Sequence, residues 1–335
     1  MKEIKTDRFR GYLNLDSYFI KKLGREFIDL EDLFINGLID YEPDGISEKF
    51  WILSPSGDRV ALYKSEIPGS YESYVELLVE EVAKVMQIPA AHYDLAMFNG
   101  GKGVISYNYL KNNSVDYSGF DVISEFYEKN LQDDKELSSL YNIDYVNDSI
   151  DDVCDKLNNL QDIWCILEER FANAPNKREI VKSIMDGLVD KLMLDVITVA
   201  IDSHTDNWKI VDDKYSSPVF DNSRSLGIFT KYKKTQVNED KKFEDSEMLL
   251  TVDNENINKP LEVLEYFLKI SSSEYKERFI EKLNNVKENI DVIPTRIEER
   301  TNASMPEHLK NHFITNMNEY LEKVSQIAND KGTIK

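Results

Sequence analysis

The sequence predicts an α+β protein with two lobes, a small β-rich lobe over residues 1–110 and a larger helical lobe over residues 111–335. Two observations lead to this prediction. In the first lobe, two pairs of short apolar runs are each joined by turn-forming residues, which is typical of β-hairpins. From about residue 115, apolar residues recur at intervals of three and four, the periodicity of helices that bury one face.

The first lobe begins with a short helix predicted over residues 28–40, which stops near Gly37. The two hairpins follow at 50–53 with 60–63 and at 93–98 with 103–107, turning at Pro-Ser-Gly-Asp and Asn-Gly-Gly. Between them, one helix is predicted to end near Gln87, because apolar residues with helical spacing stand at Tyr74, Leu77, Leu78, Val82, Val85 and Met86.

The second lobe is predicted to be mainly helical, with helices near 120–131, 151–172 and 177–200 and further helices towards the end of the chain. Two short strands are expected on either side of Asp221. A polar segment follows at 232–247. The last helix is expected to bury one face, formed by Leu309, Phe313, Met317, Leu321 and Val324.

The composition limits the possible partners. Hydrophobic residues make up 41% of the 335, enough for a substantial core, and the formal net charge is −21. That charge disfavours direct binding of nucleic acid and of anionic membranes, whereas a metal-chelated nucleotide remains compatible because the cation supplies local positive charge. The chain has two cysteines without metal-type spacing, no leader-like start and no apolar run of about 18 residues. We therefore expect a cytoplasmic protein.

A lysine and a glutamate in the first lobe could form an ion pair. Lys64 follows the apolar run 60–63, and Glu76 lies on the next predicted helix. A strand lysine paired with a helix glutamate holds nucleotide phosphates in phosphoryl-transfer enzymes. Taken singly, Lys64 could be an exposed strand end and Glu76 part of a solvated helix face. Gly45, before the first hairpin, could let backbone N–H groups approach phosphates, but an ordinary turn explains it equally well.

A second group of polar residues stands where apolar segments end. Asp202, His204 and Asn207 follow the helix at 177–200, and Asp221 follows Pro-Val-Phe. An aspartate can accept a hydroxyl proton, while amide and carboxylate oxygens suit Mg²⁺. We expect His204 to hydrogen-bond to nearby backbone and hold the loop. Singly, these residues read as caps and turns, but their order after Lys64 and Glu76 favours phosphoryl transfer.

Four segments together resemble the HipA-like serine/threonine kinases, in particular their stand-alone forms. AIDSHTDNWKI resembles the catalytic loop of that family, and PVFDNSRSLG its metal-binding aspartate segment. GISEKFWILSPSGDRVALYKSE is similar to the phosphate-loop hairpin, and YVELLVEEVAKVMQIPAAHYDLAMFNGGKGVIS to the helix and hairpin that follow. The resemblance implies a two-lobed protein-kinase-like fold and transfer of the γ-phosphoryl group of ATP, with Mg²⁺, to a serine or threonine hydroxyl of a protein.

The resemblance also implies roles for individual residues. Asp202 would be the catalytic base, with His204 beside it in the catalytic loop, and Asn207 and Asp221 would bind Mg²⁺. Residues 104–110 would form the hinge that lines the adenine pocket. The nucleotide would be bound by Gly45, Lys49, Lys64, Glu76, Tyr107 and Tyr109. An antitoxin-type protein is a further partner that the family implies.

The chain departs from the family at two places. Ser203 precedes the loop histidine where arginine is often found, which could weaken the anchoring of the loop. The five residues directly before Gly45, Asp40 to Asp44, include no serine that could inactivate the enzyme by autophosphorylation. Two alternatives therefore stay open: a nucleotide-binding pseudokinase that acts as an interaction module, and a kinase of small molecules or lipids.

Overall fold

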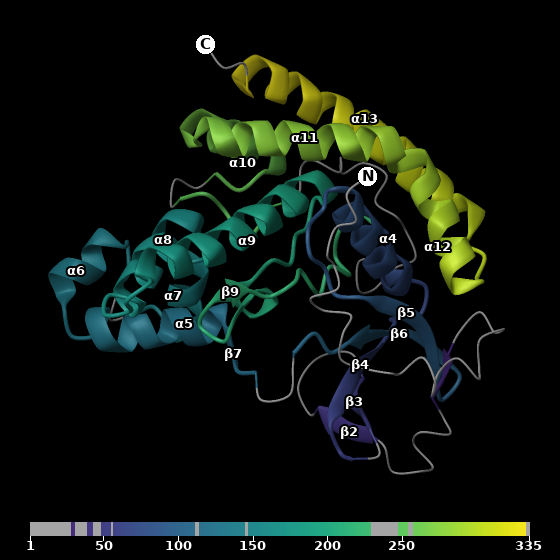
Figure 1. The fold of residues 1–335 in the computed structure, drawn as a ribbon, viewed down its shortest axis with the longest axis horizontal. Coiled ribbons are helices and arrows are strands. Elements are labelled where there is room, and N and C mark those ends of the chain that lie inside the picture. The colour runs from purple at the N-terminus through teal and green to yellow at the C-terminus, as the bar shows by residue number, and fades with distance from the viewer. Residues whose placement is uncertain are drawn as a thin grey trace. The chain divides into compact units, whose positions relative to one another are not determined.

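The fold is seen in a computed structural model of the chain (Figure 1). The structure describes residues 28–30, 39–42, 48–54, 56–110, 114–144, 147–228, 247–253 and 257–332. The chain divides into two compact units, each treated by itself. Unit 1 takes in 1–111, 221–241 and 282–321, and unit 2 takes in 112–220, 242–281 and 322–335. A division into two continuous lobes at residue 110 stays a prediction.

Unit 1 is built on a six-stranded sheet with the order β1-β5-β6-β4-β3-β2. All neighbouring strands are antiparallel except β1 and β5, which are parallel. The strands are β1 Ile28–Asp29, β2 Ile39–Glu42, β3 Lys49–Leu53, β4 Arg59–Ser65, β5 Tyr93–Phe98 and β6 Gly101–Tyr107. Both predicted hairpins, β3 with β4 and β5 with β6, are thus confirmed.

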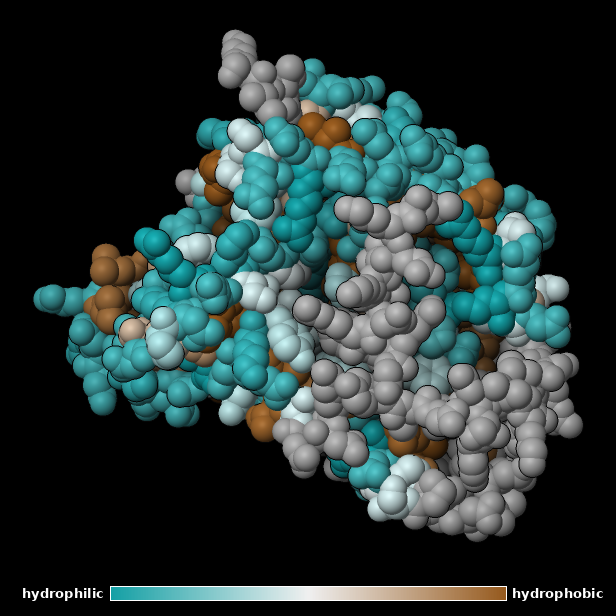
Figure 2. Space-filling view, in the orientation of Figure 1, coloured by the Kyte–Doolittle hydropathy of each residue, from teal (hydrophilic) through white to brown (hydrophobic). Residues whose placement is uncertain are grey.

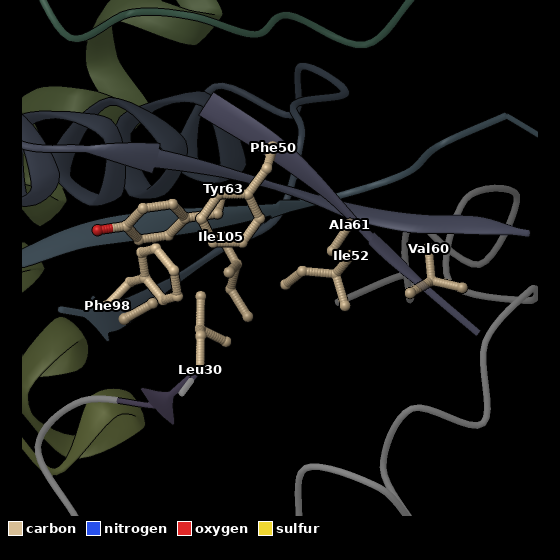
Figure 3. Close-up of a cluster of buried hydrophobic side chains, with 9 residues drawn as sticks. Leu30, Phe50, Ile52, Val60, Ala61, Tyr63, Phe98 and Ile105 are labelled. Carbon is tan, nitrogen blue, oxygen red and sulfur yellow. The ribbon is translucent and has the colours of Figure 1, made fainter. Parts of the chain in front are cut away.

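One face of this sheet buries a hydrophobic cluster (Figure 3), made of Leu30, Phe50, Ile52, Val60, Ala61, Tyr63, Ala96, Phe98 and Ile105. The rings of Phe50 and Tyr63 stack with centroids 4.7 Å apart, and Phe98 meets Phe50 edge-on at 4.8 Å. Because side chains alternate across a strand, Lys64 lies on the opposite face from Tyr63. Tyr63 therefore packs in the cluster, whereas Lys64 can take part in contacts on the other face of the sheet.

The helix α4, Glu72–Val85, belongs to unit 1 and contacts β5 and β6 (Figure 1). Its residues from Ser73 to Ala83 are buried on every side, because α12, Ile293–Thr301, also packs on it. Lys282 donates to the carbonyl of Met86 just beyond the end of α4, at 2.7 Å. A late part of the chain thus fixes the position of α4.

Unit 2 is mainly helical and contains a three-stranded sheet with the order β7-β8-β9. Its strands are β7 Asp116–Ser118, β8 Lys209–Val211 and β9 Tyr215–Ser216. Its helices are α5 Gly119–Phe126, the π-helix η2 Tyr127–Leu131, α6 Lys135–Leu140, α7 Ile150–Lys156, α8 Leu160–Arg170, α9 Lys177–Thr198, the 3₁₀-helix η3 Thr205–Asn207 and α10 Pro260–Ile270. Helix α11, Ser273–Asn289, starts in unit 2 and continues in unit 1 through the 3₁₀-helix η5, Ile290–Val292, into α12, and α13, Glu307–Gly332, starts in unit 1 and ends in unit 2.

Three sequence-based expectations about secondary structure need correction. A helix over 28–40 is wrong at both ends, where β1 and β2 lie, and residues 31–38 are outside the described part. The helix over 151–172 is two helices, since Asn159 accepts a hydrogen bond from the amide of Asp162 and so starts α8 anew. No strands flank Asp221 within the described residues: β8 and β9 both precede it.

The predicted apolar face of the last helix is confirmed, because Leu309, Phe313, Met317, Leu321 and Val324 are all buried. The polar segment expected at 232–247 lies outside the described residues except for Glu247. Figure 2 shows hydrophilic side chains over most of the described surface that faces the viewer, as a net charge of −21 requires. In the part of the chain that the structure describes, no helix is both long and apolar enough to cross a membrane.

Candidate active site

The register of the unit 1 sheet brings several polar side chains to the face that α4 covers. Lys64 on β4 stands opposite Val104 on β6 and opposite Lys49 on β3. Tyr93 on β5 stands opposite Ser106, two residues along β6 from Val104, so its side chain shares the face of Lys64. Lys49, Lys64 and Tyr93 therefore point to the same side of the sheet.

The ammonium group of Lys64 is engaged by residues 157 and 159 positions further along the chain. It forms an ion pair with Asp221 and donates to the hydroxyl of Ser223 at 3.1 Å. Burial alone would lower the pKa of Lys64, but the carboxylates of Asp221 and Glu76 outweigh it and raise the pKa above its ordinary value. Lys64 thus carries a fixed positive charge.

Glu76 on α4 is buried, with 1% of its surface exposed. Its carboxylate accepts hydrogen bonds from the backbone amide of Asn222, at 2.8 Å, and from the hydroxyl of Tyr93. Burial raises the pKa of Glu76, although the nearby charge of Lys64 acts in the opposite direction. Lys64 bonds to Asp221 and Ser223 here and not to Glu76, so close contact between Lys64 and Glu76 stays a prediction for the nucleotide complex.

Asp221 has a left-handed backbone with φ of 55°, a conformation that costs free energy in residues other than glycine. Its amide donates to the hydroxyl oxygen of Tyr93 at 3.0 Å, and this bond helps to hold the strained turn. The Asp221 side chain is 29% exposed, so a ligand can reach its carboxylate. A small hollow lies beside this group, lined by Lys64, Ser65, Glu66, Glu72, Ser73, Glu76, Val104 and Ser223.

Three of the other predicted nucleotide-binding residues are described, and they differ in position. Lys49 is opposite Lys64 in register. Tyr107 stands opposite Ala61, so it lies on the face of the hydrophobic cluster and not on that of Lys64; its hydroxyl donates to Asp94 at 2.8 Å. Tyr109 lies just after β6 and is half-buried. Gly45 is outside the described residues.

The predicted catalytic loop belongs to unit 2 and follows the end of α9. The side-chain amide of Asn207 donates to the carbonyl of Asp202, which ties the two ends of the loop together and leaves the Asn207 oxygen as an available ligand atom. His204 accepts from the amide of Asp206 at 3.3 Å and caps η3, so the expected backbone hydrogen bond is confirmed. Asp202 is half-buried.

One further side chain and one backbone amide hold this loop from outside. The amide of Asn158 donates to the carbonyl of Ser203 at 2.9 Å, and its oxygen accepts from the indole N–H of Trp208 at 3.0 Å. The amide of Gly119 donates to the carbonyl of Trp208 at 2.9 Å. A Cβ at position 119 would clash with the Trp208 ring and lie 2.6 Å from the carbonyl oxygen of Thr205, so α5 can approach only with glycine at this position.

A larger hollow of about 320 Å³ lies elsewhere in unit 2, between α5, η2 and α8. Arg170 occupies its edge, where it pairs with Glu125 and, at 3.1 Å, with Asp213. The guanidinium also lies over the ring of Tyr117, 4.7 Å from its centroid. Both carboxylates are therefore already paired with the protein's own arginine, and we assign no ligand to this hollow.

The donor atoms of the two groups suit Mg²⁺. Asp221 offers carboxylate oxygens and Asn207 an amide oxygen, the hard ligands that this ion prefers. Magnesium in phosphoryl-transfer sites is usually held by one or two protein ligands together with substrate phosphates. Among the described residues there is no cluster of three or more His, Cys, Asp or Glu side chains that could hold a metal by itself.

Sequence reasoning missed Tyr93, Asn222 and Ser223, although all three contact predicted site residues. Asn222 and Ser223 directly follow Asp221, so proximity in sequence was a usable signal. Tyr93 carried no local signal, because its contact with Asp221 depends on the pairing of β5 with β6 and on a turn 128 residues later.

Comparison with known proteins supports the fold. The proinflammatory kinase CtkA of Helicobacter pylori is similar in structure with a TM-score of 0.59 and 14% identity, over 91% of this chain and 98% of CtkA. HipA of Shewanella oneidensis MR-1, solved with HipB and operator DNA, gives a TM-score of 0.50 and 13% identity, over 86% of this chain and 67% of HipA. No protein-family model and no curated protein matches the sequence.

The chain has a HipA-like kinase fold. The predicted α+β, protein-kinase-like architecture is therefore confirmed, with its antiparallel strands towards the N-terminus and its helices towards the C-terminus. At 13–14% identity the similarity establishes the fold and leaves the activity to be argued from the residues.

Proposed function

We propose that this protein is an ATP- and Mg²⁺-dependent kinase that transfers the γ-phosphoryl group to a serine or threonine hydroxyl of a protein. The observation that carries the proposal is the ion pair between Lys64 and Asp221 beside the buried Glu76, in a chain with a HipA-like kinase fold. A strand lysine, a helix glutamate and an accessible aspartate are the groups that kinases use to hold and charge-balance ATP phosphates.

The roles follow from the chemistry of each group. Lys64 would bind phosphate oxygens as a point charge, and Asp221 and Asn207 would bind Mg²⁺, which neutralises charge on the phosphates when it is bound. Glu76 and Tyr93 would keep Asp221 and its turn in place. Asp202 would accept the proton of the acceptor hydroxyl. The oxygen of that hydroxyl would bond to the γ-phosphorus as the bond between this phosphorus and ADP breaks.

The substrate and partners are proposals by analogy of fold alone. A protein with a serine or threonine acceptor is the substrate that we propose. An antitoxin-type partner is proposed because the HipA neighbour was solved together with HipB. The net charge of −21 supports a partner surface that is basic and not itself nucleic acid.

Calorimetry of ATP binding with and without Mg²⁺ tests the assignment. We expect wild-type protein to bind ATP far more tightly with the cation, and Asp221→Ala to lose this dependence while remaining folded. Asp213→Ala is the matched control, because Asp213 pairs with Arg170 in unit 2 and has no proposed metal role. Equal affinity with and without Mg²⁺ in the wild type would refute the metal assignment.

Transfer must be measured in the same preparation, with labelled ATP and a lysate as the source of acceptor proteins. Label on serine or threonine supports the kinase proposal. Protein that binds MgATP yet transfers label to no hydroxyl, whether of a protein, a lipid or a small molecule of the lysate, would be the pseudokinase; label on a lipid or a small molecule alone would favour the other alternative.

A further inference from the structure

Three polar side chains of unit 2 form a closed, buried group next to the catalytic loop. Lys191 and Asp195 lie one turn apart on α9, with side chains 4% and 0% exposed, and the Lys191 ammonium is 3.0 and 3.2 Å from the two carboxylate oxygens. Ser203 joins them from the loop. Its hydroxyl donates to Asp195 at 2.7 Å and accepts from Lys191 at 3.0 Å.

The hydrogen bonds of this group are fully accounted for. The three N–H donors of Lys191 have three acceptors, two on Asp195 and one on Ser203. The group therefore has no spare donor with which to bind a ligand. Burial raises the pKa of Asp195, although Lys191 and Ser203 act in the opposite direction. Keeping the Asp195 carboxylate charged in the interior therefore costs free energy. An ion pair of this kind contributes little net stability and is better explained by specificity of structure.

The group is connected to the loop at one point. Helix α9 ends at Thr198, and the chain then turns at Val199 with a left-handed φ of 51°. Four residues later, Ser203 is held by its hydroxyl to α9 and by its carbonyl to Asn158. Ser203 follows Asp202 directly, so fixing its side chain and its backbone also fixes the direction of the Asp202 backbone. The loop is therefore anchored even though Ser203 stands where the HipA-like kinases often have arginine.

We propose that Lys191 and Asp195 are positioning residues for Asp202 that act through the Ser203 hydroxyl. The inference rests on the proposed function. It adds that a buried ion pair on α9, which contacts no substrate, sets the rate of phosphoryl transfer by holding the catalytic loop in one conformation.

The variant Ser203→Ala tests the tether while leaving the Lys191–Asp195 pair in place. We expect kcat to fall about 10-fold, since one buried hydrogen-bonding group is lost, and the affinity for MgATP to change less than about twofold. Ser203→Thr keeps the hydroxyl and should restore most of kcat. Thr198→Val is the control: it removes a buried hydroxyl that donates within α9, to the carbonyl of Leu194 at 2.9 Å, so kcat should stay unchanged.

Hydrogen exchange of the segment 202–208 provides a measurement that does not depend on activity. Exchange should be faster in Ser203→Ala than in wild type, and unchanged in Thr198→Val. Equal exchange in Ser203→Ala and wild type, or equal kcat, overturns the inference. If the wild type transfers no phosphoryl group at all, the proposed function fails, and the exchange measurement alone decides whether the ion pair holds the loop.

Discussion

The two groups of candidate site residues are built in different ways. In unit 1, Lys64, Glu76, Tyr93 and Asp221 come from a strand, a helix, another strand and a distant turn, and charged side chains contact one another directly. In unit 2, Asp202, His204 and Asn207 stand within six residues and are held by bonds to the loop backbone. The buried ion pair of Lys191 with Asp195 reaches this loop through a neutral hydroxyl, that of Ser203.

The two constructions suit two different tasks, the binding of phosphates and the acceptance of a proton. A group that binds highly charged phosphates needs several charges of fixed position, and a folded sheet and helix provide rigid supports for them. A group that accepts a proton needs one carboxylate at one angle, which a short, tightly bonded loop can provide. We therefore expect substitutions in the unit 1 group to affect binding and stability together, and a substitution of the loop carboxylate Asp202 to affect turnover alone.

The largest effect is expected for Asp202→Asn. A general base contributes about 10² to 10⁴ in rate, so phosphoryl transfer should fall by that factor, whereas ATP affinity should change little because Asp202 would contact the acceptor. Turnover and ATP affinity should be measured side by side. Asp206→Asn makes the same chemical change in the same loop at a side chain that is 60% exposed, and it should be nearly silent.

Two results would break the comparison at this point. Unchanged turnover in Asp202→Asn would remove the role of this residue. A large loss of ATP affinity in the same variant would show that Asp202 itself takes part in nucleotide binding, and its assignment to turnover alone would then be wrong.

The same contrast explains how far the sequence could be interpreted. The loop was recognisable because Asp202, His204 and Asn207 are close in sequence, and the hydrogen bonds that these residues make within the loop span only a few positions. Lys64 and Glu76 could be proposed from the hairpin and helix patterns. Their actual partners could not: the bond of Lys64 to Asp221 spans 157 residues and depends on the fold of the whole unit.

Other expectations failed for similar reasons. Residues 28 and 29 were predicted to be helical, but pairing with β5, some 68 positions away in the register of Ile28 with Ala96, makes them a strand. Tyr107 was proposed from its place in the hinge, and that role stays a prediction; the sequence did not show that the alternation of side chains in β6 places Tyr107 on the face of the hydrophobic cluster. Local patterns do not determine the register of a strand with its neighbours.

The next effect concerns stability and is expected for Glu80→Gln in α4. Burial would raise the pKa of Glu80, but the hydrogen bond from His92 and the charges of His92, Arg300 and Lys84 lower it to about 2. Glu80 accepts from Arg300 at 2.9 Å and pairs with Lys84 at 2.8 Å. Removing one partner of a buried ion pair typically costs about 3–5 kcal/mol, and denaturant unfolding at pH 7 would measure the loss.

The pH dependence has a definite sign. Because the folded-state pKa of Glu80 is lower than its ordinary value of 4.5, the carboxylate stabilises the fold above that pH and loses this contribution as the pH falls from about 4.5 to about 2. Wild type and Glu80→Gln should therefore become more alike in acid. Glu274→Gln, at a carboxylate that is 72% exposed, should change stability by less than about 1 kcal/mol. A constant difference between wild type and Glu80→Gln from pH 7 to pH 2 would contradict the assignment.

The smallest effect is expected for Tyr93→Phe, which tests whether the unit 1 group behaves as one network. The hydroxyl of Tyr93 accepts from the amide of Asp221 at 3.0 Å and donates to Glu76, and burial raises its pKa well above the ordinary value, so it remains a donor at any physiological pH. Its loss should cost about 1–3 kcal/mol of stability, because two buried groups lose a partner. Tyr107→Phe is the control. The Tyr107 hydroxyl donates to the partly exposed Asp94, so its loss should cost less stability.

A double-mutant cycle with Ser223→Ala sharpens the test, since the Ser223 hydroxyl is bonded to this network through Lys64. If the charges and hydrogen bonds act together, the two substitutions should couple by about 0.5–3 kcal/mol, both in the free energy of unfolding and in that of MgATP binding. Strictly additive effects would mean that Tyr93 only supports the turn at Asp221, and that the unit 1 group is held by separate bonds and does not act as one network.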